Sequence, residues 1–75
     1  MTPFQKYLSI DPNVRFGKPI ITGTRISVYD VLSWLAEGMT HAQIIEDFPE
    51  LTESQILACL AYAADKEQHL TMTTQ

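Results

Sequence analysis

Five polar residues between positions 15 and 25 carry the side chains best suited to contact nucleic acid. They are Arg15, Lys18, Thr22, Thr24 and Arg25. The cations could neutralise phosphates and the hydroxyls could donate hydrogen bonds, and the major groove of DNA admits a two-stranded ribbon that presents such groups. Two structural interpretations stay open. The cations could solubilise an exposed strand edge, or Arg25 could pair with Asp30 or Glu37 to fix the ribbon to a helix.

A second charged group, of opposite sign, lies between positions 46 and 53 and consists of Glu46, Asp47, Glu50 and Glu53. These carboxylates could hold a cation loosely, although a solvated acidic surface is the simpler interpretation. Their spacing matches no metal-binding motif, and the sequence has no Gly-rich phosphate loop and no nucleophile beside its base. We therefore expect a binding protein without catalytic, metal or cofactor residues, and not an enzyme.

Size and charge limit the possible classes of protein. The 75 residues predict one domain, and its small core makes a homodimer an attractive way to bury more apolar surface. Residues 1–27 hold four Lys or Arg against one Asp, a net charge of +3. Residues 28–75 hold one Lys against eight Asp or Glu, a net charge of −7, so the two halves suggest different partners. No leader or membrane-spanning run is recognisable, which predicts a cytoplasmic protein.

The first 27 residues predict a β-ribbon region that positions the basic side chains. Residues 1–7 are expected to form a flexible arm, and the ribbon region covers residues 8–27. Short strands are predicted at 8–10, 19–21 and 25–26, with residues 14–16 extended as well. The Asp11-Pro12-Asn13 run predicts a turn, and Gly17 and Gly23 predict two further bends.

Three capping boxes predict three helices over residues 28–67. Each pairs a hydroxyl residue with a side chain three positions later: Ser27 with Asp30, Thr40 with Gln43, and Thr52 with Gln55. The helices are expected at about 28–37, 41–48 and 53–67, followed by a frayed tail over 68–75. Apolar spacing predicts these inward-facing residues: Val28, Val31, Leu32 and Leu35; Ile44, Ile45 and Phe48; Ile56, Leu57, Leu60, Ala61 and Ala64.

This order of elements predicts a mainly α fold: a three-helix, helix-turn-helix bundle preceded by short β-strands that form a ribbon. In such a DNA-binding module the last helix reads the major groove. Here that helix begins with Glu53 and carries no Lys or Arg before Lys66, so its first turns would repel phosphates. If the chain binds DNA, the ribbon is the better candidate.

The order of motifs also resembles the domain of unknown function 433 family. The resemblance covers residues 10–64 and rests on these runs: Ile10-Asp11-Pro12, Gly17-Lys18-Pro19-Ile20-Ile21, Gly23-Thr24-Arg25-Ile26, Leu35-Ala36-Glu37-Gly38 and Phe48-Pro49-Glu50-Leu51-Thr52. It implies a homeodomain-like three-helix fold. Members of the family are commonly encoded beside a PIN-like nuclease and are regarded as antitoxins of type II toxin–antitoxin pairs.

The resemblance implies no enzymatic activity and assigns no partner-binding residue. Combined with the charge distribution, the resemblance leads to a hypothesis in which the basic ribbon binds DNA and the protein thereby regulates its own expression. Glu46, Asp47, Glu50 and Glu53 would then bind the basic RNA-binding groove of a PIN-like toxin. Two alternatives are a stand-alone DNA-binding transcriptional regulator and an adaptor that binds only protein.

Overall fold

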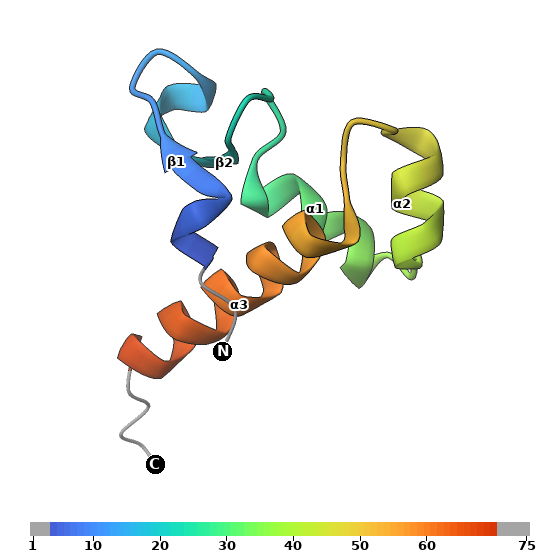
Figure 1. Cartoon of the computed structure of the whole chain (residues 1–75). Coiled ribbons are helices and arrows are strands. Elements are labelled where there is room, and N and C mark those ends of the chain that lie inside the picture. Colours follow the sequence, from blue (N-terminus) through green and yellow to red (C-terminus); the bar gives the residue numbers. More distant parts are fainter. Residues whose placement is uncertain (1–3, 71–75) are drawn as a thin grey trace.

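The structure, a computed structural model, describes residues 4–70, in which a two-stranded ribbon is followed along the chain by three α-helices. In chain order the elements are η1 (Phe4–Lys6), β1 (Leu8–Ile10), η2 (Arg15–Gly17), β2 (Pro19–Ile21), α1 (Val28–Ala36), α2 (His41–Asp47) and α3 (Glu53–Leu70), where η marks a single 3₁₀-helical turn. Helix α3 contacts η1, α1 and α2, and α2 lies on the opposite side of the molecule from the ribbon (Figure 1). The predicted fold of three helices preceded by a β-ribbon is confirmed.

The ribbon pairs β1 with β2 in antiparallel register, with Leu8 opposite Ile21 and Ile10 opposite Pro19. The prediction of a third strand at 25–26 is wrong. The chain returns in a tight turn at Gly23 (φ 86°), where the Ile21 amide donates to the Ile26 carbonyl over 2.9 Å. On this side of β2 the pairing consists of that closing bond and one isolated bridge between Ile20 and Ser27, so no third strand forms.

The prediction of extended chain at 14–16 holds for Val14 (φ −124°, ψ 125°) and is wrong for Arg15 and Phe16. Arg15, Phe16 and Gly17 have φ angles of 52°, 58° and 78°, so three successive residues lie in the left-handed region. This region is unfavourable for residues with a Cβ, and two of these three have one. The turn that precedes it is as predicted: the Asn13 amide donates to the Asp11 carboxylate over 2.9 Å. The ribbon therefore ends in a tightly curled loop.

All three capping boxes form, which explains where the helices begin. At α1 the Ser27 hydroxyl accepts from the Asp30 amide over 2.9 Å, and Asp30 accepts from the Ser27 amide over 3.1 Å. Thr40 with Gln43 and Thr52 with Gln55 exchange the same two bonds. Helix α3 continues to Leu70, so residues 68–70 belong to the helix and not to the expected tail.

The core is formed where β2 and the three helices meet. Its buried members are Ile21, Val28, Val31, Ile44, Leu51, Ile56 and Cys59. In α3 the predicted apolar face is only partly right, because Leu57 and Leu60 remain 42% and 38% exposed while Ala58 and Cys59 are buried. The helix carries two apolar rows, and α1 and α2 cover the row that holds Ile56 and Cys59. The other row faces outward.

The start of the chain is packed wherever the structure describes it. Phe4 meets Tyr62 edge to face at 5.7 Å between ring centres, which holds η1 against α3. The expectation of a flexible arm over 1–7 therefore fails for residues 4–7. Residues 1–3 of that arm and 71–75 of the predicted tail lie outside the described residues. Between residues 4 and 70, none of the helices has the length and apolar character required to cross a membrane.

Candidate functional site

The curled loop at the end of the ribbon is fixed to α1 by Arg15. Its guanidinium donates to both carboxylate oxygens of Asp30, at 3.0 and 3.3 Å, and to the carbonyl of Arg25 at 3.3 Å. The sequence suggests that Arg25 could pair with Asp30. In the structure Asp30 pairs with Arg15 instead, because the left-handed loop brings residue 15 over the start of α1. Two parallel bonds of this kind give both strength and geometric definition.

Asp30 therefore has two structural tasks. Its carboxylate accepts a hydrogen bond from the Ser27 amide at the start of α1 and forms an ion pair with Arg15. Burial raises the pKa of Asp30, but the hydrogen bonds with the Ser27 amide, Arg15 and the Ser27 side chain outweigh it and hold the pKa below its ordinary 3.8. The group is ionised at neutral pH, which keeps the ribbon joined to the helix.

The five residues predicted to contact DNA lie together in the ribbon and the turn that follows, but they do not all face solvent. Arg15 is engaged by Asp30, and the Thr24 hydroxyl donates to the Ile21 carbonyl and accepts from the Ile26 amide. Thr22 and Arg25 are exposed, and Lys18 places its ammonium 5.7 Å from the centre of the Tyr29 ring. The basic surface is therefore smaller than the sequence implied.

The four predicted acidic residues lie at the far end of the helical region. Glu46 and Asp47 are in the last turn of α2, Glu50 follows in the connecting turn, and Glu53 begins α3. All four are exposed. Glu53 Oε2 lies 2.6 Å from His41 Nδ1, whereas Glu46, Asp47 and Glu50 have no ion pair among the side chains that the structure describes, residues 4–66. We call these three residues the acidic end.

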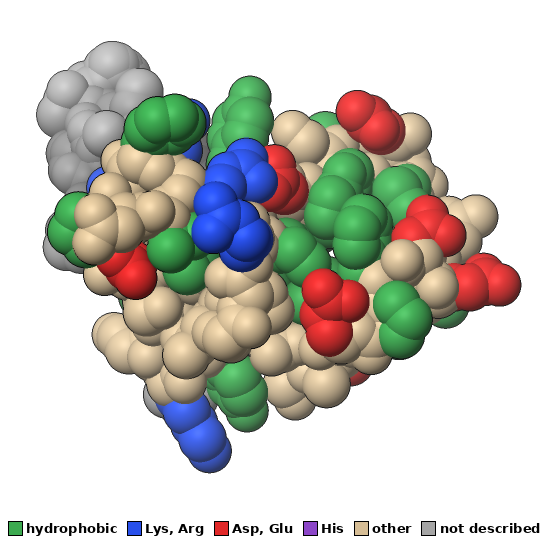
Figure 2. Space-filling view, turned by 90° about the horizontal axis from the view of Figure 1, so that it is seen from above, with side chains coloured by type: hydrophobic (Ala, Val, Ile, Leu, Met, Phe, Trp, Pro, Cys, Tyr) green, Lys and Arg blue, Asp and Glu red, His purple; other side chains and the backbone are tan. Residues whose placement is uncertain are grey.

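The position of the acidic end is unfavourable for an isolated helix. The C-terminus of a helix carries a partial negative charge, and α2 has no basic residue in its last turn to balance Glu46 and Asp47. On the face shown in Figure 2, most of the acidic side chains lie on the α2 side of the molecule, whereas basic side chains lie near the centre. A basic surface of another molecule would relieve this repulsion.

Cys59 and Trp34 both take part in packing of the core. Cys59 is fully buried in the core, and burial raises the pKa of its thiol to about 12, so it is not a nucleophile at neutral pH. Trp34 stacks on Phe48 with 4.4 Å between ring centres and helps to close the core. Among the side chains that the structure describes, no group of three potential metal ligands occurs.

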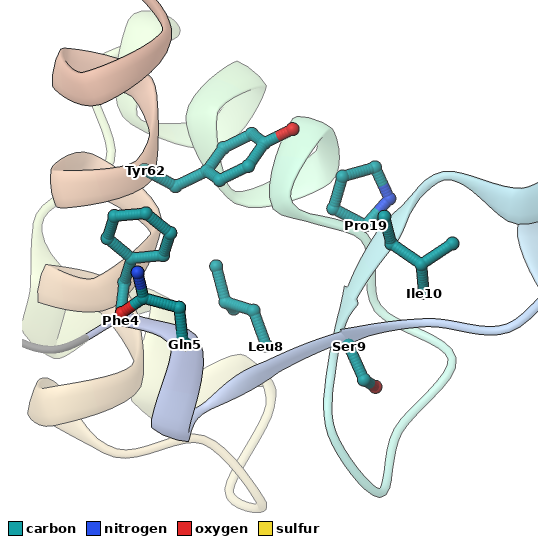
Figure 3. A pocket seen from close by; sticks show the side chains of 7 residues that line it. All are labelled: Phe4, Gln5, Leu8, Ser9, Ile10, Pro19 and Tyr62. Carbon is teal, nitrogen blue, oxygen red and sulfur yellow. The ribbon is translucent and has the colours of Figure 1, made fainter.

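One feature on the ribbon side could not be found from the sequence. An apolar hollow of about 280 Å³ opens between the ribbon, η1 and α3, with Phe4, Leu8, Ile10, Pro19 and Tyr62 in its wall (Figure 3). A second hollow of about 230 Å³ shares Pro19 and Tyr62 and extends to Tyr29 on α1. Sequence periodicity does not indicate the first hollow, because its walls come from elements more than fifty residues apart, at Phe4 and Tyr62.

The architecture defines a small α-rich domain in which a clamped β-ribbon precedes three capped helices. The chain belongs to the family described as "Protein of unknown function (DUF433)", whose sequence model matches residues 8–63. That range begins with β1 and ends within α3, so it contains both Arg15 and Asp30.

Two similar proteins extend this finding. The "Uncharacterized protein y4eO" of Sinorhizobium fredii is 30% identical over 59 residues, which cover 79% of this chain and 27% of that protein. The crystal structure of a DUF433 member protein from Anabaena variabilis has a TM-score of 0.79 and 25% identity, covering 87% of this chain and 64% of its own. This chain thus spans about a quarter of the first protein and less than two thirds of the second.

Proposed function

We propose that this chain is a cytoplasmic antitoxin that binds and neutralises a PIN-like ribonuclease toxin, using the acidic end as part of the contact surface. The proposal combines the resemblance of residues 10–64 to a family regarded as antitoxins with one structural observation. That observation is the set of exposed carboxylates of Glu46, Asp47 and Glu50, which have no ionic partner among the described side chains of residues 4–66. A ribonuclease must present a basic surface to RNA, and such a surface complements these charges.

The chain is proposed as a binding protein and not as an enzyme. Inhibition would follow from occupying the basic groove, because bound RNA and the acidic end compete for the same cations. Charge complementarity of this kind raises the association rate and selects the partner more than it sets the final affinity. Binding should therefore be fast and should weaken as salt is added.

DNA binding through the ribbon is the second candidate. It is favoured by the exposure of Thr22 and Arg25, with Lys18 nearby, on the side opposite the acidic end. It is opposed by the engagement of Arg15 with Asp30, because only Lys18 and Arg25 of the three ribbon cations then lack a carboxylate partner among the described residues. DNA binding would allow the antitoxin to autoregulate or the chain to act as a stand-alone transcriptional regulator. Without DNA binding, the chain would be an adaptor that binds only protein. A homeodomain-like arrangement of α1–α3 is compatible with all three roles.

The test begins with the reading frame adjacent to this one. We expect it to encode a PIN-like nuclease whose purified product forms a complex with this chain in a calorimetric titration. The variant with Glu46→Gln, Asp47→Asn and Glu50→Gln should bind about tenfold more weakly or worse. Glu37→Gln, which changes an exposed carboxylate at the end of α1, is the control and should bind as the unchanged chain does. A neighbour that does not bind would contradict the proposal.

A further inference from the structure

The curled loop holds one aromatic side chain in water. Phe16 is 96% exposed, and its φ of 58° is a backbone conformation that residues with a side chain seldom adopt. Arg15, clamped to Asp30, and the bond from the Lys18 amide to the Arg15 carbonyl (3.1 Å) hold the loop in this form. A strained, well-held loop that presents a phenyl ring is typical of a preorganised binding anchor.

The same end of the molecule contains an unfilled apolar hollow. Its rim includes Ile10, which is 65% exposed, and Pro19; these two ribbon residues lie on either side of the chain segment that contains Phe16. Phe4 and Tyr62 form the opposite wall, and none of the described residues that line the hollow is charged (Figure 3). An aromatic ring could therefore enter without removing a charge from water.

The hollow is large enough for a phenyl ring. A cavity of roughly 150 Å³ accommodates benzene, and this hollow has about 280 Å³. The Phe4 and Tyr62 rings already meet edge to face, so a third ring could extend an aromatic cluster with favourable geometry. Phe16 does not fill the hollow of its own chain, because almost all of its surface is exposed.

We propose that two copies of this chain form a dimer in which Phe16 of each copy enters the hollow between Phe4, Leu8, Ile10, Pro19 and Tyr62 of the other. The chain itself supplies both complementary parts at one end, which is what a two-fold symmetric interface requires. A single small domain also gains from such burial, since it cannot build a large core alone. This dimer does not depend on the proposed antitoxin function.

The test measures self-association of the full chain by sedimentation equilibrium over a wide concentration range. The unchanged chain should form dimers. Phe16→Ser should raise the dimer dissociation constant at least about a hundredfold, because two anchors are lost per dimer. Leu57→Ser is the matched control: Leu57 is exposed on α3, and its replacement should leave the constant unchanged. Circular dichroism should show the same helix content in each variant.

Mixing variants tests the geometry of the contact directly. Ile10→Glu puts a charge at the rim of the hollow and should weaken the dimer while leaving Phe16 intact. A mixture of the Phe16→Ser and Ile10→Glu chains should associate more tightly than either alone, because the first keeps an open hollow and the second keeps the anchor. A mixture that associates no better would overturn the proposed pairing of ring and hollow.

Three other results would also overturn it. The unchanged chain could be monomeric at millimolar concentration, or Phe16→Ser could dimerise normally. Loss of the dimer in Leu57→Ser instead would show that the exposed row of α3 is the interface. If the chain is monomeric and Phe16→Ser weakens its binding to a DNA duplex, Phe16 is a wedge between base pairs and not an anchor for a second copy.

Discussion

Arg15 and Asp30 are joined by two hydrogen bonds of 3.0 and 3.3 Å, although one belongs to the end of the ribbon and the other to the first turn of α1. The same carboxylate accepts the Ser27 amide that begins the helix. One side chain thus both starts α1 and fixes the loop that presents Phe16. The shape of the ribbon end depends on the cap of a helix.

Replacing Asp30 should destabilise the fold through both contacts. We expect Asp30→Ala to lower the free energy of unfolding by about 1–3 kcal/mol, since it removes a capping contact and an ion pair that is partly buried. Lys18→Met, at an exposed cation with no carboxylate partner in the described chain, should change it by no more than about 0.5 kcal/mol. Urea unfolding gives both values, and a double-mutant cycle with Arg15→Met isolates the pair. A coupling energy near zero would show that the clamp contributes nothing.

The clamp should also make stability depend on pH in acid. The pKa of Asp30 is lowered by folding, so its contribution is complete above the unfolded pKa of 3.8 and is lost as the pH falls through the lower folded pKa. The difference in unfolding free energy between the unchanged chain and Asp30→Asn should therefore be larger at about pH 6 than at about pH 2.5. A difference that is equal at both pH values, or larger in acid, would contradict the ionised clamp.

The threonine caps allow a comparison between two exposed threonines. Thr40→Ala removes the hydroxyl that accepts from the Gln43 amide and should cost about 1 kcal/mol of unfolding free energy. Thr22→Ala removes an exposed hydroxyl with no hydrogen bond to the part of the chain whose side chains are described, so its effect should stay within about 0.5 kcal/mol. Thermal unfolding at matched concentration distinguishes them. Equal effects would mean that the cap bond is not stabilising.

Two neighbouring residues of α3 test which apolar row forms the core. Ile56 is fully buried and Leu57 is 42% exposed. Ile56→Ala should cost about 2–5 kcal/mol, whereas Leu57→Ala should cost less than about 1 kcal/mol, because only the first leaves a cavity. The measurement is urea unfolding at a concentration low enough to keep both chains monomeric. The reverse order would place the row of Leu57, and not that of Ile56, in the core.

The parts of the fold that could be predicted from the sequence depend on local chemistry. Ser27, Thr40 and Thr52 each bond to a residue three positions away, so each helix start is determined within four residues. The turn after Asp11 is local in the same way. For these features the sequence contains both partners of each bond in one short window.

The parts that could not be predicted depend on contacts between distant segments. The left-handed loop at Arg15 and Phe16 contradicts the local preference of both residues and is held by Asp30, fifteen positions from Arg15. In α3 two apolar rows fit the helical repeat equally well, and only packing against α1 and α2 decides between them. The hollow by Tyr62 likewise exists only once η1, the ribbon and α3 are assembled.

The proposed capture of a toxin is tested most directly by titrating this chain into a ribonuclease assay of the PIN-like protein encoded by the adjacent frame. We predict stoichiometric loss of RNA cleavage with the unchanged chain. Replacing Glu46, Asp47 and Glu50 by their amides should require about tenfold more protein or worse, with the deficit largest at low salt. Equal inhibition by both chains at every salt concentration, or no inhibition by either, would contradict a role for the acidic end.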